Sequence, residues 1–308
     1  MDGDVGRIAA RFGGSPPITP LAGPWGHSGV FRAGAVVLKC WRGPRRERGL
    51  VETAQLRSLR AAGFASAPAP VAGRGGWWEY HRDVLWTAQE YVEPVPGRPA
   101  GTAAARIGAV LARLHATEPD PRPGDRSRID DLAGLDLAAV PAGHAPAVAA
   151  ALRHVLDRRA ELTGLPRGRV HGDVNFDNAI LGRGGRLVLI DWEFTRRDVR
   201  VLDLATLLAP KRRPDGSFRT AGPALIARIV AGYQAAAAEP LGPDELRLLP
   251  AAALAHYLLV LRDVLAAGSP YAAVVAAAVA ELQARTVFMS SSTRASSIGL
   301  AARPSTLK

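Results

Sequence analysis

A short stretch in the middle of the chain carries four side chains that can exchange protons or bind a metal ion. They are His171, Asp173, Asn178 and Asp191. Apolar runs at 179–181 and 187–190 flank a Gly-Arg-Gly-Gly turn, which predicts two short strands joined as a hairpin. Asp173 and Asn178 would lie at one end of this hairpin, and Asp191 where its second strand stops. Carboxylate and amide oxygens on adjacent loop ends suit Mg²⁺, which proteins hold with one or two carboxylates plus substrate phosphates.

The order of these residues is also typical of phosphoryl transfer. Kinases use one Asp to accept the proton of the substrate hydroxyl, and an Asn and a later Asp to hold Mg²⁺ on the phosphates. On that pattern Asp173 is the candidate catalytic residue, and Asn178 and Asp191 are the candidate metal ligands. The alternative is a solvated acidic turn beside a hairpin, and it leaves the spacing of the four residues unexplained.

The motif His-Gly-Asp-x-x-x-x-Asn, followed by Ile-Asp-Trp-Glu, resembles the aminoglycoside phosphotransferase and choline kinase group of small-molecule kinases. Protein kinases have His-Arg-Asp and Asp-Phe-Gly in these places, whereas this chain has Gly172 and Asp191-Trp192-Glu193. The resemblance implies an α+β, bilobal protein-kinase-like fold, with a small β-rich N-lobe over 1–93 and a larger, mostly helical C-lobe over 94–289. It also implies transfer of the γ-phosphate of ATP, or of GTP, to a hydroxyl group of a metabolite or antibiotic, with Mg²⁺ as cofactor.

The composition is that of an ordinary globular protein of 308 residues, with 48% hydrophobic and 6% aromatic residues. Its single cysteine, Cys40, excludes an intramolecular disulfide and favours a reducing compartment. We find no signal peptide and no uncharged run of membrane-spanning length, and therefore expect a cytoplasmic protein. Residues 290–308 lack periodicity and are predicted to form a disordered tail.

The net charge of +11 raises the alternative of nucleic-acid binding. The basic residues are scattered, however, with the densest group at 42–48, and no aromatic residues alternate with them to stack on bases. The expected partners are therefore a nucleotide and a small hydroxylated substrate, without nucleic acid or membrane. The protein is expected to be a monomer or a homodimer.

Lysine is rare in this chain. Of the 39 basic residues only three are Lys, at positions 39, 211 and 308. Lys39 lies inside the apolar run Ala-Val-Val-Leu-Lys-Cys-Trp, where a charge is costly unless it is paired or functional. Kinases place a Lys on the third strand of the small lobe to bind nucleotide phosphates and pair with a helix Glu. A Lys that extends from an edge strand to solvent is the alternative.

Helical spacing of apolar residues predicts a helix at about 45–62, with Glu52 as the partner of Lys39. Glu47 competes for this role but lies nearer the basic turn. Strands are expected at 19–22 and 29–32, joined by a small-residue loop. That loop includes Ser28 and Gly29 and could lie over phosphates, although a plain hairpin loop would look similar.

Two further β-rich runs, 77–81 and 85–92, are separated by a turn at Arg82-Asp83. The second run ends in a Pro- and Gly-rich segment, as expected of a linker between lobes. By its resemblance to the kinase hinge, adenine would bond to the Glu90 carbonyl and the Val92 amide.

The rest of the chain is predicted to be mainly helical, apart from a loop at 120–144 with one brief turn near 130–137. The predicted helices cover residues 103–115, 145–163, 201–208, 221–238, 243–266 and 270–288. His115 is interpreted as a helix-packing residue, and His171 as a residue that hydrogen-bonds the loop backbone. Asp203 matches a family Asp that braces the catalytic loop, and an Asp in so apolar a setting needs backbone donors.

The acceptor is the open question within the kinase class. A homoserine kinase-like activity and an aminoglycoside O-phosphotransferase activity are both compatible with the motifs. The mixed to basic stretch 193–200 favours a neutral or anionic hydroxylated substrate over a polycationic one. A non-catalytic nucleotide-binding protein is the alternative class, but such proteins usually lose one of Lys39, Asp173 or Asp191.

Overall fold

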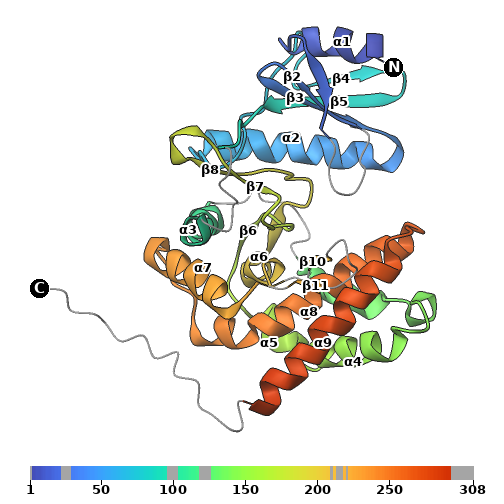
Figure 1. The fold of residues 1–308 in the computed structure, drawn as a ribbon, viewed down its shortest axis with the longest axis vertical. Coiled ribbons are helices and arrows are strands. Elements are labelled where there is room, and N and C mark those ends of the chain that lie inside the picture. The colour runs from blue at the N-terminus through green and yellow to red at the C-terminus, as the bar shows by residue number, and fades with distance from the viewer. Residues whose placement is uncertain are drawn as a thin grey trace, which may run out of the picture. The chain divides into compact units, whose positions relative to one another are not determined.

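The computed structural model describes residues 2–21, 29–95, 103–117, 126–208, 211–212, 218–219 and 221–292 (Figure 1). The chain forms two compact units. The first comprises Met1–Ser127, Thr163–Leu208 and Ala221–Leu249, and the second comprises Arg128–Leu162, Ala209–Thr220 and Pro250–Lys308. The predicted lobes over 1–93 and 94–289 divide the chain elsewhere, and that division stays a prediction.

The first unit begins with an antiparallel five-stranded sheet of order β1-β2-β3-β5-β4. Its strands are β1 (Ile18–Pro20), β2 (Val30–Ala33), β3 (Val36–Trp41), β4 (Trp78–His81) and β5 (Val84–Glu90). Lys39 lies on the central strand β3, opposite Val30 on one side and Thr87 on the other. Because side chains alternate along a strand, Val37, Lys39 and Trp41 share one face and Val36, Leu38 and Cys40 the other.

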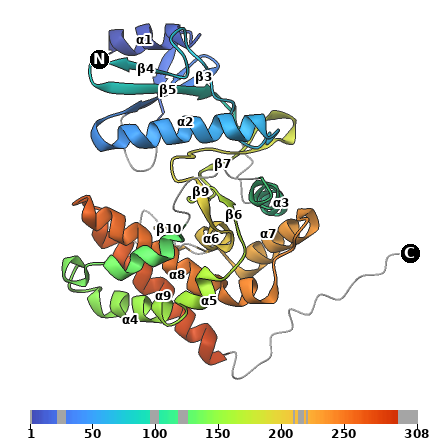
Figure 2. The ribbon, with the colours of Figure 1, turned by 180° about the vertical axis from the view of Figure 1, so that it is seen from behind.

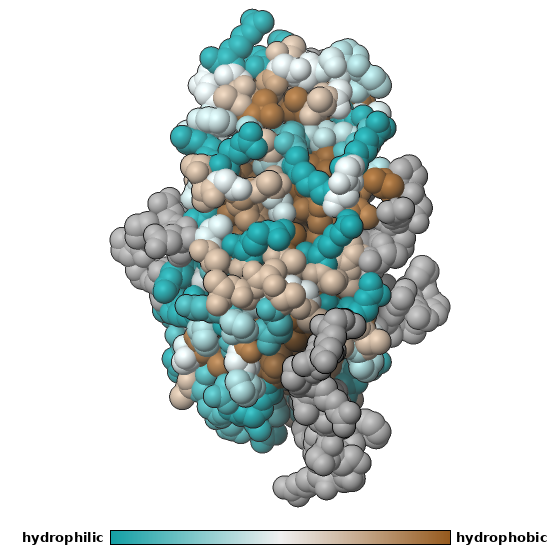
Figure 3. Space-filling view, turned by 90° about the vertical axis from the view of Figure 1, so that its left-hand side faces the viewer, coloured by the Kyte–Doolittle hydropathy of each residue, from teal (hydrophilic) through white to brown (hydrophobic). Residues whose placement is uncertain are grey.

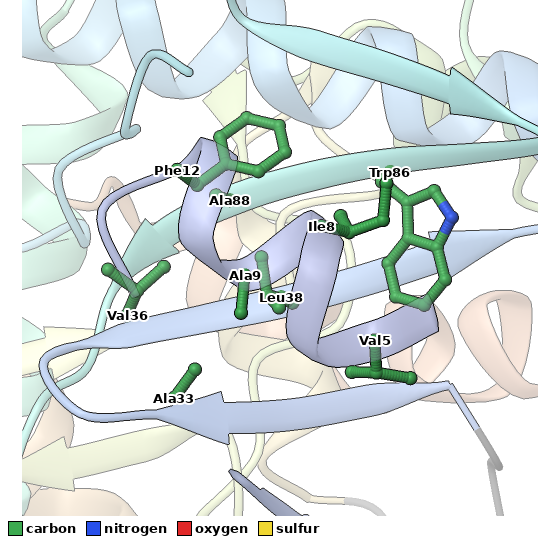
Figure 4. Close-up of a cluster of buried hydrophobic side chains, with 9 residues drawn as sticks. All are labelled: Val5, Ile8, Ala9, Phe12, Ala33, Val36, Leu38, Trp86 and Ala88. Carbon is green, nitrogen blue, oxygen red and sulfur yellow. The ribbon is translucent and has the colours of Figure 1, made fainter. Parts of the chain in front are cut away.

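Helix α1 (Asp2–Arg11), which the sequence analysis did not predict, covers the face of the sheet that carries Leu38. Its apolar residues at spacings of three and four pack onto apolar residues of β2, β3 and β5 (Figure 4). The cluster consists of Val5, Ile8, Ala9, Phe12, Ala33, Val36, Leu38, Trp86 and Ala88. Because Val36 and Leu38 are buried under α1 and side chains alternate along a strand, the side chain of Lys39 lies on the opposite face of β3.

Helix α2 (Arg46–Ala61) lies across the opposite face, where the side chain of Lys39 points (Figures 1 and 2). It confirms the predicted helix at 45–62. The β4–β5 hairpin closes with two residues at positive φ, Arg82 at 47° and Asp83 at 60°. Positive φ at both central residues is the geometry of the tight hairpin turn, so the predicted turn is confirmed.

The remainder of the first unit supplies the catalytic loop and its supports. It contains α3 (Ala104–His115), β6 (Arg167–Val170), β7 (Ala179–Leu181), β8 (Leu187–Leu189), β9 (Arg196–Val199), α6 (Val201–Thr206) and α7 (Pro223–Ala236). The predicted hairpin is present as β7 and β8, with Ala179 opposite Leu189. Strand β6 pairs with β9, a pairing that the sequence analysis did not predict.

Helices α3 and α7 cross at two glycines. A Cβ built on Gly108 would lie 1.9 Å from the carbonyl oxygen of Ile229, and one on Gly232 would lie 1.9 Å from that of Ala105. Side chains of any size are therefore excluded at both positions, and the two helix backbones are in direct contact.

The second unit is helical and is cross-linked by ion pairs. It contains η3 (Arg128–Gly134), η4 (Leu137–Ala139), α4 (Ala145–Leu156), most of α5 (Arg159–Thr163), the short pair β10 (Lys211–Arg212) and β11 (Phe218–Arg219), and α9 (Ala272–Ser292). Arg128 pairs with Asp263 at 2.8 Å, and Arg262 with Asp131 at 3.1 Å. Helix α8 (Pro243–Ala266) belongs to both units by its residue range.

Two of the described helices differ from their predicted bounds by more than two residues. The single helix predicted at 145–163 is broken into α4 and α5. Helix α9 continues through Ser292, so residues 290–292 of the predicted tail are helical, and residues 293–308 lie outside the described part of the chain.

Among the described helices, α8 has the length and apolar composition of a membrane span, but 61% of its apolar window is buried inside the protein. Such burial is usual for a core helix. On the face drawn in Figure 3, hydrophilic and hydrophobic residues are mixed, as they are on the surfaces of globular proteins.

Candidate active site

Lys39 joins three elements through its ammonium group. Its Nζ donates to Glu52 Oε1 on α2 at 2.7 Å and to Asp191 Oδ1, after β8, at 3.0 Å. The structure thus brings together three residues singled out from the sequence, with Glu52 rather than Glu47 as the partner of Lys39. Lys39 and Glu52 are buried, whereas the side chain of Asp191 is 38% exposed. Asp191 is therefore the member of the triad that a ligand can approach.

The charges of Lys39 and Asp191 hold each other ionised, whereas burial, above all, raises the pKa of Glu52. Burial alone would lower the pKa of Lys39, but the carboxylates of Glu52 and Asp191 outweigh it and raise that pKa. Burial alone would raise the pKa of Asp191, but Lys39, above all, holds it below its usual range. At neutral pH this position therefore carries an ammonium group and a partly exposed carboxylate side by side.

Asp191 has an unusual backbone for a residue with a side chain, because its φ is +69°. The Trp192 N–H, directly after it, donates to Glu52 Oε1 at 3.0 Å. The indole of Trp192 is buried, donates to the Leu189 carbonyl at 2.7 Å, and lies 4.5 Å from the ring of His171. These contacts on both sides hold the chain in the strained conformation that directs the Asp191 carboxylate.

Asp173 and Asn178 lie together in the loop between β6 and β7. The Asn178 amide Nδ2 donates to Asp173 Oδ2 at 2.9 Å and to the Asp173 carbonyl at 2.9 Å. Asn175, which the sequence analysis did not single out, accepts from the backbone N–H groups of Asp177 and Asn178 at 2.9 and 3.0 Å. Its side chain stabilises the turn that places Asn178 beside Asp173.

The acidity of Asp173 is shifted opposite to that of Asp191. Burial, and next the negative charge of Asp191, raise the pKa of Asp173 to about 7. The amides of Asn175 and Asn178 oppose this shift but do not cancel it. Paired carboxyl groups with separated pKa values are typical of acid–base and metal-assisted chemistry.

His171 is a support of this loop. Its Nε2 lies 2.9 Å from the Ile190 carbonyl, and the Asp173 N–H donates to its Nδ1 at 3.3 Å. A carbonyl can only accept, so Nε2 carries the hydrogen and Nδ1 accepts. Burial lowers the pKa of His171, in keeping with this neutral ring. The interpretation of His171 as a backbone-bonding residue agrees with these contacts.

Asp203 on α6 supports the loop between β6 and β7 through hydrogen bonds to its backbone. Its carboxylate accepts from the backbone N–H of His171 at 2.7 Å and of Gly172 at 2.8 Å, and from His115 Nε2 at 3.1 Å. Gly172 has a φ of +86°, and a Cβ there would lie 2.6 Å from the Phe194 carbonyl oxygen. The loop therefore requires Gly at the position where protein kinases have Arg.

The residues at this site fit a magnesium ion bound together with phosphates. The Asn178 side chain donates through Nδ2 to Asp173, so its carbonyl oxygen Oδ1 points away from that contact. The Asp191 side chain is partly exposed. Within the described residues no group of three or more His, Cys, Asp and Glu side chains could form a complete metal cage. Two oxygen ligands completed by phosphates and water are what Mg²⁺ usually takes from a protein.

The remaining predicted residues are placed with less detail. Ser28 lies outside the described residues. The carbonyl of Gly29 accepts from the Cys40 N–H at 2.7 Å, and a Cβ there would lie 2.8 Å from the Cys40 sulfur, so Gly29 packs against β3. Glu90 ends β5 and pairs with Arg186 of the β7–β8 hairpin, and Val92 follows in the linker.

Two arginines and a glutamate were missed by the sequence analysis. Glu193 is nearly buried and pairs with Arg45 at 3.3 Å and Arg48 at 3.6 Å, both next to or in the first turn of α2. The sequence shows these arginines only as part of a basic cluster, and their distance of about 150 residues from Glu193 gives no signal.

A five-stranded sheet with a buried Lys–Glu pair, a loop carrying Asp173 and Asn178, and Asp191 directly after the following hairpin define a kinase-like phosphotransferase. A sequence profile of the phosphotransferase enzyme family matches residues 17–249. The homoserine kinase of Phenylobacterium zucineum (strain HLK1) is 33% identical over 226 residues, which cover 68% of this chain and 67% of that protein. Homoserine kinases of Hyphomonas neptunium (strain ATCC 15444) and Xanthobacter autotrophicus (strain ATCC BAA-1158 / Py2) are each 31% identical, with 52% and 62% of their own lengths covered.

Solved structures share the fold at low identity. Choline kinase LicA from Streptococcus pneumoniae superposes with a TM-score of 0.67 at 14% identity, covering 92% of this chain and 99% of that one. Amicoumacin kinase hAmiN, in complex with AMP-PNP, Ca²⁺ and Ami, gives 0.64 at 18% identity, covering 92% and 94%. The α+β, protein-kinase-like fold is thereby confirmed.

The chain belongs to the phosphotransferase enzyme family. The expected class, a small-molecule kinase that phosphorylates a hydroxyl group, is confirmed by this membership. The matched regions span about half to two thirds of the homoserine kinases' own lengths, so the acceptor is a separate question.

Proposed function

We propose that the protein transfers the γ-phosphate of ATP to a hydroxyl of a small amino acid of the homoserine type. The single observation that carries the kinase chemistry is the Lys39 ammonium held between Glu52 and Asp191. It places a compact positive charge beside a partly exposed carboxylate, as binding of a metal–nucleotide complex requires.

The residues take the following roles in this proposal. Lys39, oriented by Glu52, binds the α- and β-phosphates. Asn178 and Asp191 hold Mg²⁺, which neutralises charge on the transferring phosphate when it is bound. Asp173 orients the acceptor hydroxyl and takes its proton, and most of the rate enhancement comes from positioning and charge neutralisation.

The nucleotide base is proposed to bind along the end of β5. The Val92 N–H takes part in no backbone hydrogen bond within the described ranges, and it follows directly after the strand. Together with the Glu90 carbonyl it would contact adenine, or guanine if GTP serves as donor. Ser28 and Gly29 are proposed to contribute to the loop over the phosphates.

The acceptor class is supported by two observations. Three curated relatives at 31–33% identity are homoserine kinases. In addition, Arg45 and Arg48 present half-exposed guanidinium groups near Asp191 and Glu193. A carboxylate on the acceptor would suit this positive charge, whereas a polycationic aminoglycoside would be repelled by it.

The test is an acceptor panel with purified protein and Mg·ATP. L-Homoserine, L-serine, L-threonine, choline, ethanolamine, spectinomycin and kanamycin are incubated separately, and the phosphorylated product is identified by mass spectrometry. A parallel preparation of Asp173→Asn controls for contaminating kinases. We expect the highest kcat/KM for homoserine. A higher value for an antibiotic or choline would overturn the acceptor, and ATP binding with no turnover on any compound would favour the non-catalytic alternative.

We further propose that the protein acts in the cytoplasm, because its one cysteine and its substrates suit a reducing, ATP-containing compartment. The two-lobe division near residue 93 belongs to the same proposal. In that division the β-rich part carries Lys39, and the part that follows carries Asp173.

A further inference from the structure

A chain of hydrogen bonds runs from helix α7 to the catalytic loop. The Tyr233 hydroxyl on α7 lies 3.0 Å from His115 Nδ1 at the end of α3. His115 Nε2 lies 3.1 Å from Asp203 Oδ2, and Asp203 accepts from the backbone of His171 and Gly172 at 2.7 and 2.8 Å. Asp173 follows these two residues directly. The kinase reaction as described above uses neither Tyr233 nor His115.

The direction of each bond in this chain is fixed by chemistry. The Asp203 carboxylate can only accept, so His115 Nε2 carries the hydrogen that it donates. In the neutral imidazole Nδ1 is then an acceptor, and the Tyr233 hydroxyl must donate to it. Burial keeps this hydroxyl protonated, because it raises the pKa of Tyr233. With a neutral His115 ring, each group in the chain therefore has one role.

Close packing holds these groups at their distances. Tyr233 and His115 are both buried, and their rings lie 5.5 Å apart. Helices α3 and α7, which carry them, are in backbone contact at Gly108 and Gly232. On the other side, a Cβ on Gly168 of β6 would lie 2.6 Å from the His115 carbonyl oxygen. His115 is therefore wedged between α7 and β6 and cannot move without displacing one of them.

We propose that Tyr233 and His115 are positioning residues for phosphoryl transfer, which hold Asp203 in the orientation that orders the His171–Gly172 backbone and so aims Asp173. The proposal rests on the kinase activity proposed above. It makes the position of α7 a determinant of turnover, although α7 contributes no group to the reaction. Loss of the chain loosens the loop but leaves Lys39 and Glu52 untouched, so it lowers kcat without weakening ATP binding.

Tyr233→Phe is the sharpest variant, because it removes one oxygen atom and keeps the ring packing. We expect kcat to fall about fivefold to tenfold, the effect of one buried hydrogen bond, with KM for ATP unchanged within about twofold. His115→Leu should lower kcat further, and His115→Gln should restore part of the loss, because its amide can still donate to Asp203. The assay uses Mg·ATP and the acceptor that the panel identifies.

The matched control is Thr286→Val, which removes a buried hydroxyl bonded to the Leu282 carbonyl at 2.9 Å in the second unit. It should change the melting temperature as Tyr233→Phe does and leave kcat unchanged. Hydrogen exchange of a peptide covering 170–174 supplies a readout that needs no activity. Exchange there should accelerate in Tyr233→Phe, while exchange in β3 stays as in the wild type.

An unchanged kcat and unchanged exchange at 170–174 in Tyr233→Phe would overturn the proposal, as would an equal loss of kcat in Thr286→Val. If the wild type phosphorylates no acceptor, the proposed function fails, yet the exchange experiment still decides whether the hydrogen-bond chain orders the loop. If His115→Leu does not fold, Tyr233→Phe and His115→Gln still carry the test.

Discussion

Asp173 belongs to the loop between β6 and β7 and Asp203 accepts hydrogen bonds from it, yet the pKa values of the two carboxyl groups are shifted in opposite directions. Burial would raise the pKa of Asp203, but the His115 ring and the loop N–H groups more than offset it and hold that pKa below its usual range. Among the described residues, the donors to the Asp173 carboxylate are side-chain amides, from Asn178 at 2.9 Å and Asn175 at 3.4 Å, and the carboxylate faces the charge of Asp191. Its pKa rises to about 7.

Such a difference is expected between a supporting carboxylate and the reacting carboxylate that we propose Asp173 to be. Three donors, the His171 and Gly172 N–H groups and the His115 ring, bond the Asp203 carboxylate, and they stabilise its ionised form and fix its position. Asp173 has fewer donors and lies near the carboxylate of Asp191, so its ionised form is less stabilised than that of Asp203. A loop can thus derive its rigidity from one aspartate and its reactivity from another.

The strongest test of this contrast is Asp173→Asn. The amide keeps the size of the side chain but cannot accept the proton of the acceptor hydroxyl, so kcat should fall by about a hundredfold or more. The melting temperature at pH 8 should be equal to or above that of the wild type, because the folded-state pKa is raised and its ionised form is therefore destabilising there. Steady-state kinetics and thermal unfolding check both parts, and retention of a tenth of the wild-type turnover would contradict the role of Asp173.

The two proposed metal ligands should differ in strength. Asp191→Ala should weaken Mg²⁺-dependent ATP binding more than Asn178→Ala, because a carboxylate offers a full charge to a hard cation and an amide only a dipole. Calorimetric titrations with ATP, with and without Mg²⁺, measure the difference for each variant. Equal losses would mean that the two ligand roles are misassigned.

Lys39→Arg asks whether the triad needs a compact cation. The planar guanidinium of Arg should not fit between Glu52 and Asp191, so kcat/KM for ATP should fall about tenfold or more, nearly as far as in Lys39→Ala. Thermal unfolding of both variants controls for folding. Near wild-type kinetics in Lys39→Arg would show that only the positive charge matters.

Asp203→Asn should change stability as well as kcat, because Asp203 supports the loop that carries Asp173. Its folded pKa lies below the ordinary value of 3.8, so its ionised form contributes stability that is fully present above that pH and is lost as the pH falls through the folded pKa. The free energy of unfolding should therefore differ between wild type and variant by about 2 kcal/mol at pH 7. Urea unfolding at pH 7 and at decreasing pH should show this difference shrinking towards and below pH 4, and a difference independent of pH would contradict the role of an ionised Asp203.

The sequence predicts the parts of the site that are local. Asp173, Asn178, Asp191 and the hairpin between them lie within one continuous motif, and the isolated Lys39 in an apolar strand identifies β3. The brace at Asp203 is also predicted, by the resemblance to the family, and its apolar setting adds that the carboxylate needs donors.

What the sequence does not predict depends on contacts between distant segments. Glu193 meets Arg45, and Tyr233 meets His115, only after the helices have packed. Strands β6 and β9 are rich in Arg and lack the apolar alternation of a half-buried strand, so their pairing gives no pattern. Helix α1 is a different case, because the apolar residues Val5, Ile8, Ala9 and Phe12 have helical spacing and this pattern in the sequence predicts a helix.

Helix α1 has a practical consequence for recombinant expression. The family profile begins at residue 17, so a gene trimmed to the recognisable family region would encode a protein without α1. Leu38, Trp86 and their neighbours on that face of the sheet would then be open to solvent. An uncovered apolar sheet face promotes self-association, so such a trimmed protein should aggregate although every residue of the motif is intact.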